Sequence, residues 1–133
     1  MGSSAPATSL LRNPDLYLLA AAGQAADAAA CVTPIAYIGR CLDTVGVPAD
    51  KRWIFPVVKT ASAFGLASAR VAPGLARLTA AMLTVYFCLA VGAHLRVRDL
   101  RLNFAAASSL LVFYAALTVT GPPTPPAASP RTH

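Results

Sequence analysis

The sequence predicts an all-α integral membrane protein, an up-down-up-down bundle of four helices, and three observations lead to this prediction. Only 12% of the 133 residues are charged, whereas 56% are apolar. The mean hydropathy is +0.59, and a soluble domain of this length would need a far more charged surface. The apolar residues also gather in runs of about 20, the length that crosses the hydrocarbon core of a bilayer.

The N-terminal segment, residues 1–14, is small and polar, and we predict a flexible start to the chain. It ends at residues 13–15, where Asn-Pro-Asp favours the beginning of a helix. The first span is predicted over about 16–39. A polar stretch with turn residues follows it, and Trp53 directly after this stretch is typical of a membrane interface.

The second, third and fourth spans are predicted over about 53–71, 75–95 and 102–120, with short connections between them. Short connections force neighbouring helices to run antiparallel, so both termini are expected on one side of the membrane. The segment 121–133 is rich in proline, which cannot continue a helix, and is predicted to be a disordered tail.

Small residues at four-residue spacing predict close packing of the first two spans. Such spacing lets two helix backbones approach each other within a membrane. The residues concerned are Ala22, Ala26 and Ala30 in the first span and Ala61, Gly65 and Ala69 in the second. We therefore expect these two helices to touch.

The formal net charge of +6 comes from cations at the ends of apolar runs, a placement typical of membrane flanks and not of a nucleic-acid-binding surface. The first and third loops hold six cations, and the opposite side holds four. By the positive-inside rule, these loops are expected in the cytoplasm and both termini outside. The six are Arg40, Lys51, Arg52, Arg96, Arg98 and Arg101, and the four are Arg12, Arg70, Arg77 and Arg131.

Two ionisable residues stand inside predicted spans, Asp27 in the first and Lys59 in the second. Each charge costs roughly 2.5–3.5 kcal/mol at the centre of a lone helix, so each needs a partner or water. In a hairpin of the two spans, the lysine side chain can cover most of their difference in depth. The pair then lines a pocket that binds a ligand headgroup or moves a proton. Alternatively, it fixes the helix register, or the lysine reaches the surface and leaves Asp27 protonated.

Further polar side chains share the helix faces of these two charges. If the two faces meet, a narrow polar seam results. The residues at the required spacing are Gln24, Asp27 and Cys31 on the first helix and Phe55, Lys59 and Ser62 on the second.

The three cysteines, Cys31, Cys41 and Cys88, form no CxxC pair and have no companion histidine, so neither a zinc site nor a thioredoxin-like motif is indicated. Cys31 and Cys88 lie at comparable depth, which leaves a close approach and redox work open. The other interpretation is that each is a small buried hydrophobe. Cys41, near the membrane surface, is expected to be the more accessible thiol.

His94, Arg96 and Arg98 end the third span and are predicted to form a cationic rim at the membrane interface. Such a rim offers donors to an anionic lipid headgroup, a quinone carbonyl or the acidic loop of a partner. The simpler alternative is that these side chains only anchor the helix end. A lone histidine supplies no metal site.

The sequence contains no motif of an independent catalyst. It lacks a paired-carboxylate acid/base set, a Ser-His-Asp arrangement, a Gly-rich phosphate loop and a haem-attachment motif. We therefore expect no catalysis by this chain alone. No cofactor is evident from the sequence, and a quinone stays open as a bound molecule.

Three stretches, Lys59-Thr-Ala-Ser-Ala-Phe-Gly-Leu, Val71-Ala-Pro-Gly-Leu-Ala-Arg and Gly92-Ala-His-Leu-Arg-Val-Arg-Asp, together resemble the DoxX-like family of small bacterial membrane proteins. The likeness covers about residues 42–120, and Gln24 and Asp27 have no counterpart in it. The resemblance implies a four-helix membrane fold. It also marks Lys59, His94, Arg96 and Asp99 as positions of interest.

Members of the wider family look like accessory subunits of quinone-linked respiratory or thiosulfate-oxidising systems, or like partners in membrane redox and oxidative-stress assemblies. The resemblance therefore implies a multi-pass, non-catalytic subunit in the bacterial plasma membrane, bound to a membrane protein partner or to a second copy of itself. Two alternatives stay open. One is a carrier that binds a lipid or quinone at the Asp27–Lys59 seam, and the other is an oxidoreductase that uses Cys31 and Cys88.

Overall fold

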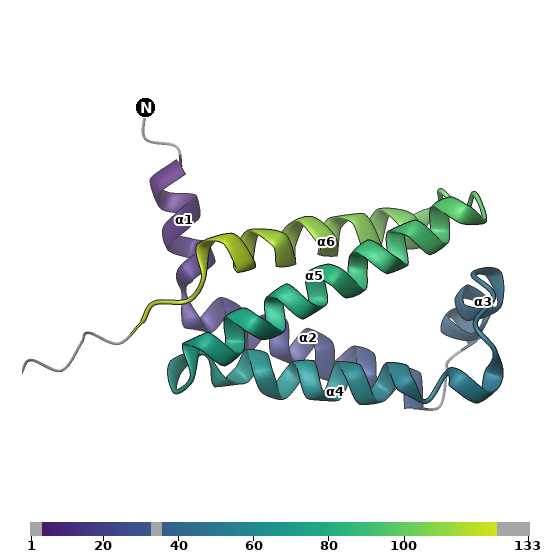
Figure 1. Cartoon of the computed structure of the whole chain (residues 1–133), viewed down its shortest axis with the longest axis horizontal. Coiled ribbons are helices and arrows are strands. Elements are labelled where there is room, and N and C mark those ends of the chain that lie inside the picture. The colour runs from purple at the N-terminus through teal and green to yellow at the C-terminus, as the bar shows by residue number, and fades with distance from the viewer. Residues whose placement is uncertain (1–3, 33–35, 125–133) are drawn as a thin grey trace, which may run out of the picture.

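The computed structural model describes residues 4–32 and 36–124, and every regular element within these ranges is helical (Figure 1). The all-α prediction is thereby confirmed for the described residues. The helices are α1 (Ser4–Arg12), α2 (Pro14–Val32), α3 (Ala36–Thr44), α4 (Ile54–Ala67), α5 (Pro73–Arg96) and α6 (Leu102–Thr120). Two short 3-10 helices lie in the connections, η1 (Ala49–Lys51) and η2 (Ser68–Arg70).

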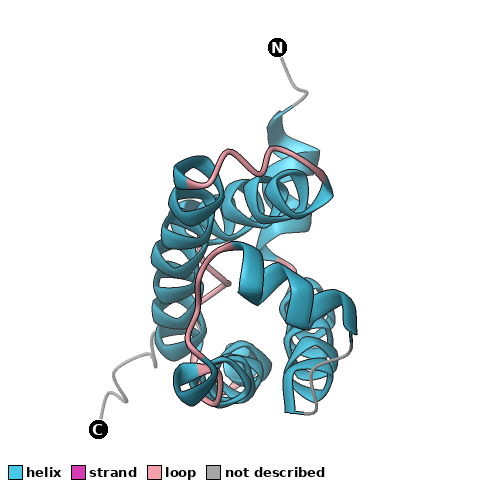
Figure 2. Cartoon of the chain, turned by 90° about the vertical axis from the view of Figure 1, so that its right-hand side faces the viewer, coloured by secondary structure: helices cyan, strands magenta, loops and turns pink. Residues whose placement is uncertain are grey.

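The longer helices form two antiparallel hairpins. α2 lies along α4 and α5 lies along α6, while α4 also contacts α5. In Figure 1 the chain runs from left to right in α2 and α5 and returns in α4 and α6. The right-hand end holds α3, the segment that leads into α4, and the turn between α5 and α6. Figure 2 looks onto this end, which we call the loop end.

Residues 4–12 form helix α1, whereas the sequence predicted a flexible segment over 1–14, of which residues 1–3 lie outside the described residues. α1 occupies most of this segment, and its Leu11 packs against the buried core, which stabilises a helix too short to be stable alone. The predicted helix start is confirmed. Pro14 is the first residue of α2, and the Asn13 side chain accepts a hydrogen bond from the backbone N–H of Asp15 at 2.9 Å.

The first predicted span, about 16–39, is divided in the structure. α2 ends at Val32, and α3 begins as a separate helix at Ala36. The sequence between them contains Pro34, and proline disfavours a continuous helix because it lacks an N–H and clashes with the preceding turn. The predicted tail, 121–133, lies outside the described residues from 125 onward, and residues 121–124 are not helical.

Among the described residues, α5 and α6 are long and apolar enough to cross a membrane, and only 28% and 17% of their apolar stretches are buried inside the molecule. A soluble protein would bury such helices, so this exposure favours lipid as their surroundings. α2 and α4 do not meet the same measure. α2 is rich in alanine and carries Gln24 and Asp27, and α4 is 14 residues long.

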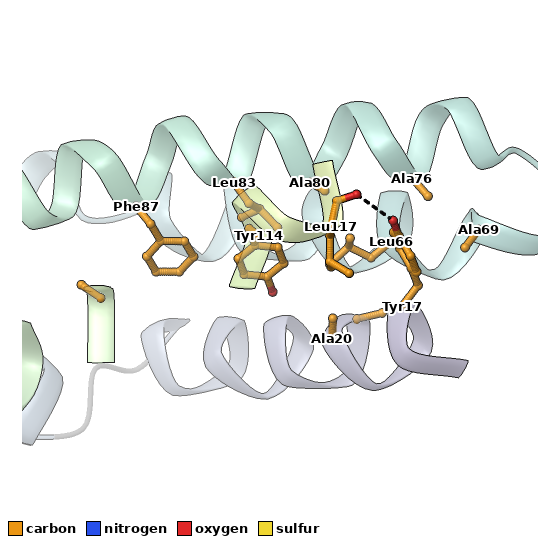
Figure 3. Packing of buried hydrophobic residues seen from close by; sticks show 12 residues of the cluster. Tyr17, Ala20, Leu66, Ala69, Ala76, Ala80, Leu83, Phe87, Tyr114 and Leu117 are labelled. Atoms are coloured by element: carbon orange, nitrogen blue, oxygen red, sulfur yellow. Dashed lines mark hydrogen bonds between the residues drawn. The ribbon is translucent and has the colours of Figure 1, made fainter. Parts of the chain in front are cut away.

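The core joins both hairpins and combines large side chains with alanines (Figure 3). Tyr17 of α2, Leu66 of α4, Leu83 of α5, and Tyr114 and Leu117 of α6 are the largest side chains with almost no exposed surface. The Tyr17 hydroxyl donates to the Leu117 carbonyl at 3.2 Å, so its buried polar group has a partner. The four longer helices therefore share one continuous core.

α2 and α4 touch, as predicted, but the small-residue stripes do not make the contact in the expected way. Ala22 and Ala26 face outward. Gly65 is buried, and a β-carbon added there would collide with the Thr79 side chain on α5. Gly65 therefore permits the close approach of α4 to α5.

Candidate functional site

An ion pair links α2 and α4 inside the molecule. The Lys59 ammonium donates to the Asp27 carboxylate. The Lys59 side chain is 8% exposed and that of Asp27 is 38% exposed, so the pair lies at the edge of the interior. The Lys59 Nζ atom also lies 5.4 Å from the centre of the Tyr86 ring on α5, within range of a cation–π interaction. The pairing hypothesis is confirmed, and the alternative of a lysine that reaches the surface is wrong.

Gln24 lies on the same face of α2 but contacts α6 and not the ion pair. Its Nε2 atom donates to the Tyr114 hydroxyl at 2.8 Å. Its Oε1 atom is buried without a hydrogen-bond partner in the described part of the chain. On α4, the Ser62 hydroxyl donates to the Val58 carbonyl of its own helix at 2.7 Å. The predicted seam is thus made of separate contacts and is not one connected network.

A cavity of about 230 Å³ opens beside the ion pair and extends to the loop end. We call it the central cavity. Its charged and polar lining includes Asp27, Lys59, Tyr86 and His94, and Asn103 of α6 also lines it. The rest of the lining is largely apolar and includes Ile38, Leu42, Phe55, Phe87, Ala90 and Leu110. A buried ammonium group therefore faces a mainly apolar space.

A second cavity, of about 320 Å³, adjoins the central cavity beneath α3. The two share part of their lining, including Phe55, Tyr86 and His94. The further lining of the second cavity is apolar, namely Val45, Val47, Leu89 and Ala93. Asp27 and Lys59 therefore line the central cavity and not the second one, whereas His94 lies where the two cavities adjoin.

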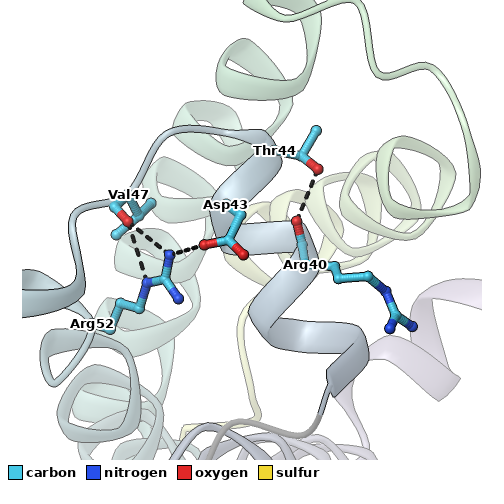
Figure 4. A network of polar contacts seen from close by, with 5 residues as sticks. All are labelled: Arg40, Asp43, Thr44, Val47 and Arg52. Carbon is cyan, nitrogen blue, oxygen red and sulfur yellow. Dashed lines mark hydrogen bonds and ion pairs between the residues drawn. The ribbon is translucent and has the colours of Figure 1, made fainter.

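α3 supplies part of the wall of both cavities and is tied to the chain that leads into α4 (Figure 4). Arg52 donates to the Asp43 carboxylate of α3 and, from Nε at 3.2 Å and a terminal nitrogen at 3.1 Å, to the Val47 carbonyl. The Thr44 hydroxyl donates to the Arg40 carbonyl at 2.8 Å, which closes the last turn of α3. This network holds the wall in place.

His94 does not form the predicted cationic rim with Arg96 and Arg98. It is 6% exposed, its Nδ1 atom lies 3.1 Å from Oδ2 of Asp99, and its ring lines the central cavity. Arg96 instead donates to the Val45 carbonyl at 3.0 Å, and Arg98 is exposed. The three side chains therefore do not form one cationic surface, and the predicted rim is wrong.

The turn after α5 explains this arrangement. The backbone N–H of Asp99 donates to the His94 carbonyl at 3.0 Å, and that of Arg98 donates to the Leu95 carbonyl at 3.1 Å. With Arg98 at a φ of 56°, these bonds form the Schellman motif that commonly ends a helix. The motif folds the chain back and brings the Asp99 carboxylate to the His94 ring.

The structure does not bring the predicted cysteine pair to one site. Cys31 is buried and lines the central cavity, whereas Cys88 is exposed on α5 and does not contribute to that lining. Cys41 also lines the cavity and is partly buried, whereas Cys88 is exposed on α5. Burial and the nearby Asp99 carboxylate raise the pKa of the Cys41 thiol, which disfavours its reactive thiolate form.

The sequence reasoning missed Tyr86 and Tyr114 as members of the site. Their signal was a tyrosine in the middle of an apolar span, since a buried phenol hydroxyl usually has a polar partner. Asp99 was marked by the family resemblance alone. Its separation from His94 by five residues, across a predicted turn, is the pattern that could have indicated the contact.

Comparison with known proteins supports the resemblance. A family model described as the DoxX-like family matches residues 16–119, which is most of the chain. The match includes α2, although the resemblance read from the sequence began only at about residue 42. No curated protein and no solved structure matches the chain.

Proposed function

This chain belongs to the DoxX-like family, and from this premise we propose a membrane protein that binds a small molecule with an apolar body and a polar head in the central cavity. Family membership and the apolar exterior of α5 and α6 already indicate a small membrane protein. The proposal adds a multi-pass, four-helix arrangement in the bacterial plasma membrane, together with the binding function. The observation that carries the binding function is the buried Lys59 ammonium beside the cavity.

Four crossings require that α2 and α4 cross the bilayer beside α5 and α6. The outward side chains of α4 support this, because Val57 is 55% and Phe64 is 75% exposed, as expected of groups that face lipid. Pairing with Lys59 also lowers the cost of placing Asp27 within a membrane. The positive-inside rule then favours the loop end on the cytoplasmic side.

Lys59 selects the polar end of the ligand. An ammonium group has three N–H donors, and Asp27 accepts from one of them, so Lys59 can also donate to an oxygen in the cavity. The carbonyl of a quinone and the oxygens of a lipid headgroup are suitable acceptors. The rings of Tyr86 and Phe87 offer aromatic surface to a flat ligand, and the adjoining apolar cavity can take a hydrophobic substituent.

A quinone is the ligand that we favour, because it also suits the role implied by the family resemblance, a non-catalytic partner of a membrane redox assembly. The charged and aromatic groups of the lining can hold a quinone but cannot themselves supply its electrons. Those electrons would come from a partner protein. A redox pair of Cys31 and Cys88 is not favoured, since Cys88 does not line the cavity.

Native mass spectrometry of the tagged protein, gently extracted from its own membrane, tests the binding function. We expect a bound quinone or lipid-like molecule in the wild-type protein and its loss in Lys59→Met. Lys51→Met is the matched control, because Lys51 is exposed at the loop end and lines neither cavity. Protein subunits that co-purify would support the partner role.

A second variant guards against misfolding of Lys59→Met. Combining it with Asp27→Asn leaves no unpaired charge in the interior, so the double variant should fold and still lack the bound molecule. A wild-type protein that carries no small molecule, or a ligand that persists in the folded double variant, would contradict the proposed site.

A further inference from the structure

A separate pocket of about 510 Å³ lies at the loop end, and three arginines line it. Arg40 lies on α3, Arg98 lies in the turn after α5, and Arg101 directly precedes α6. The one acidic residue in this lining, Asp99, already pairs with His94. We propose that this pocket binds a phosphate group, carried either by a lipid headgroup or by a solute.

The three arginines have no acceptor for their guanidinium groups among the described residues. Most of the other arginines do have one, and they are structural. Arg52 and Arg70 pair with the carboxylates of Asp43 and Asp15, and Arg77 and Arg96 donate to backbone carbonyls. Uncompensated positive charge is therefore gathered in this pocket, with three guanidinium groups against one engaged carboxylate.

The chemistry of these side chains favours phosphate over other partners. A guanidinium group presents a planar fork of N–H donors that matches two oxygens of a phosphate. Three such groups from three separate segments can surround one phosphate, which a simple lipid-anchoring role at a helix end does not require. Thr44 and Asn103 also line the pocket and add polar surface.

The backbone around the pocket agrees with this assignment. Arg98 has a φ of 56°, a conformation in which glycine is favoured, so an arginine is kept there at a cost of roughly 1 kcal/mol. The first turn of α6 also borders the pocket through Leu102, and no side chain caps this end of the helix. The positive end of the α6 helix dipole adds to the potential that the arginines create.

The pocket is distinct from the central cavity, although Cys41 and Asn103 line both. A phosphate group bound there would lie next to the loop end of that cavity. The inference does not depend on the ligand proposed for the cavity, because it rests on other side chains.

Binding to the purified protein in detergent tests this inference. The probes are dioctanoyl phosphatidylglycerol, dioctanoylglycerol, which lacks the phosphate, and inorganic phosphate. Native mass spectrometry measures the lipids, and a thermal-shift titration measures phosphate. We expect at least about tenfold preference for the phospholipid over dioctanoylglycerol, the size of one charge-assisted contact.

Arg40→Gln and Arg101→Gln should each weaken phospholipid binding about tenfold, since each removes a charged donor. Neither guanidinium group has a hydrogen bond or an ion pair in the described part of the chain, so both variants should keep the wild-type circular dichroism spectrum. Lys51→Gln is the control, because it removes the same charge from the same end but does not line the pocket, and it should leave binding within about twofold.

The probes also separate the two sources of phosphate. Arginine-dependent binding of the phospholipid alone would identify a lipid headgroup, and arginine-dependent binding of inorganic phosphate alone would identify a soluble ligand. Binding of both would support a phosphate site open to either source. Equal retention of dioctanoylglycerol, or an equal loss in Lys51→Gln, would overturn the inference.

Discussion

Lys59 and Asp27 bring two charges into a largely apolar interior, and the cost of each depends on the presence of the other. Paired, each charge has an opposite neighbour. If one is removed, the other is left in surroundings that solvate it poorly. Gln24 and Tyr114 depend on each other in the same way, although neither is charged. The Gln24 amide nitrogen donates to the Tyr114 hydroxyl, while the amide oxygen has no hydrogen-bond partner among the described residues.

For the ion pair, we expect Lys59→Met to destabilise the detergent-solubilised protein more than Lys59→Met combined with Asp27→Asn. The single change should cost roughly 2–3 kcal/mol, somewhat less than for a fully buried pair because Asp27 is partly exposed. Thermal melts of the two single variants and the double variant form the necessary cycle. Losses that simply add would contradict the coupling.

For the neutral pair, Tyr114→Phe removes the acceptor of the Gln24 amide and leaves the whole buried amide without a partner. A loss of about 1–3 kcal/mol in stability is expected, as for other unsatisfied buried groups. Adding Gln24→Met replaces the amide by an apolar side chain of similar length and should restore most of the loss. Melting temperatures measure both effects, and a double variant no more stable than Tyr114→Phe would show that the hydrogen bond is not the cause.

At the scale of the elements, Gly65 and Gly23 offer a matched comparison. A β-carbon at Gly65 would collide with Thr79, whereas one at Gly23 meets nothing within 4 Å. Gly65→Ala should therefore cost roughly 1–3 kcal/mol through overpacking, while Gly23→Ala should be neutral or stabilising by up to about 1 kcal/mol through helix propensity. Unfolding in detergent compares the two, and a Gly65→Ala variant as stable as Gly23→Ala would refute the close approach of α4 and α5.

The elements also show what the sequence could predict. Local signals were sufficient for the start of α2 at Pro14 and for the bounds of α6, and the cost of isolated charge was sufficient to pair Asp27 with Lys59. The separation of α2 from α3 was not predicted. The long apolar run favoured one continuous span, and too little importance was given to Pro34 within it. The burial of His94 depends on the Schellman turn at Arg98, where an arginine stands in place of the glycine that would have signalled it.

Contacts between elements were harder to predict. A helix with apolar residues on all sides does not reveal which face turns inward, so the position of Tyr86 within an apolar span indicated a polar partner but did not identify that partner as Lys59. The same uncertainty placed Ala22 and Ala26 in an interface that they do not enter.

Across the whole molecule, packing and polar chemistry lie at different ends. Apart from Phe87, the large core side chains come from the first half of α2 and α5 and the second half of α4 and α6, as with Tyr17, Leu66 and Leu117. The central cavity and the arginine-lined pocket occupy the loop end. One end of the molecule therefore provides stability, and the other offers space and charge for a ligand.

Cysteine labelling can measure which side of the membrane each end of the molecule faces. If α2, α4, α5 and α6 all cross the bilayer, residue 50 and residue 74 lie on opposite sides. If only α5 and α6 cross, the chain before α5 stays on one side, and the two residues lie together. Asp50→Cys and Gly74→Cys, each in a variant without the native cysteines, distinguish the two arrangements. Both positions tolerate the change, since Asp50 is exposed and a β-carbon at Gly74 meets nothing within 4 Å.

With a membrane-impermeant maleimide, we expect Gly74→Cys to react in intact spheroplasts and Asp50→Cys only after they are broken, because the cationic loop end favours the cytoplasm. Leu100→Cys, exposed in the turn between α5 and α6, is the control, since it lies opposite Gly74→Cys in either arrangement. The inverse pattern would retain four crossings and refute the orientation. Reaction of Asp50→Cys and Gly74→Cys from the same side would refute the four crossings, because a membrane-spanning α4 cannot leave the residues before it and the residues after it on one face.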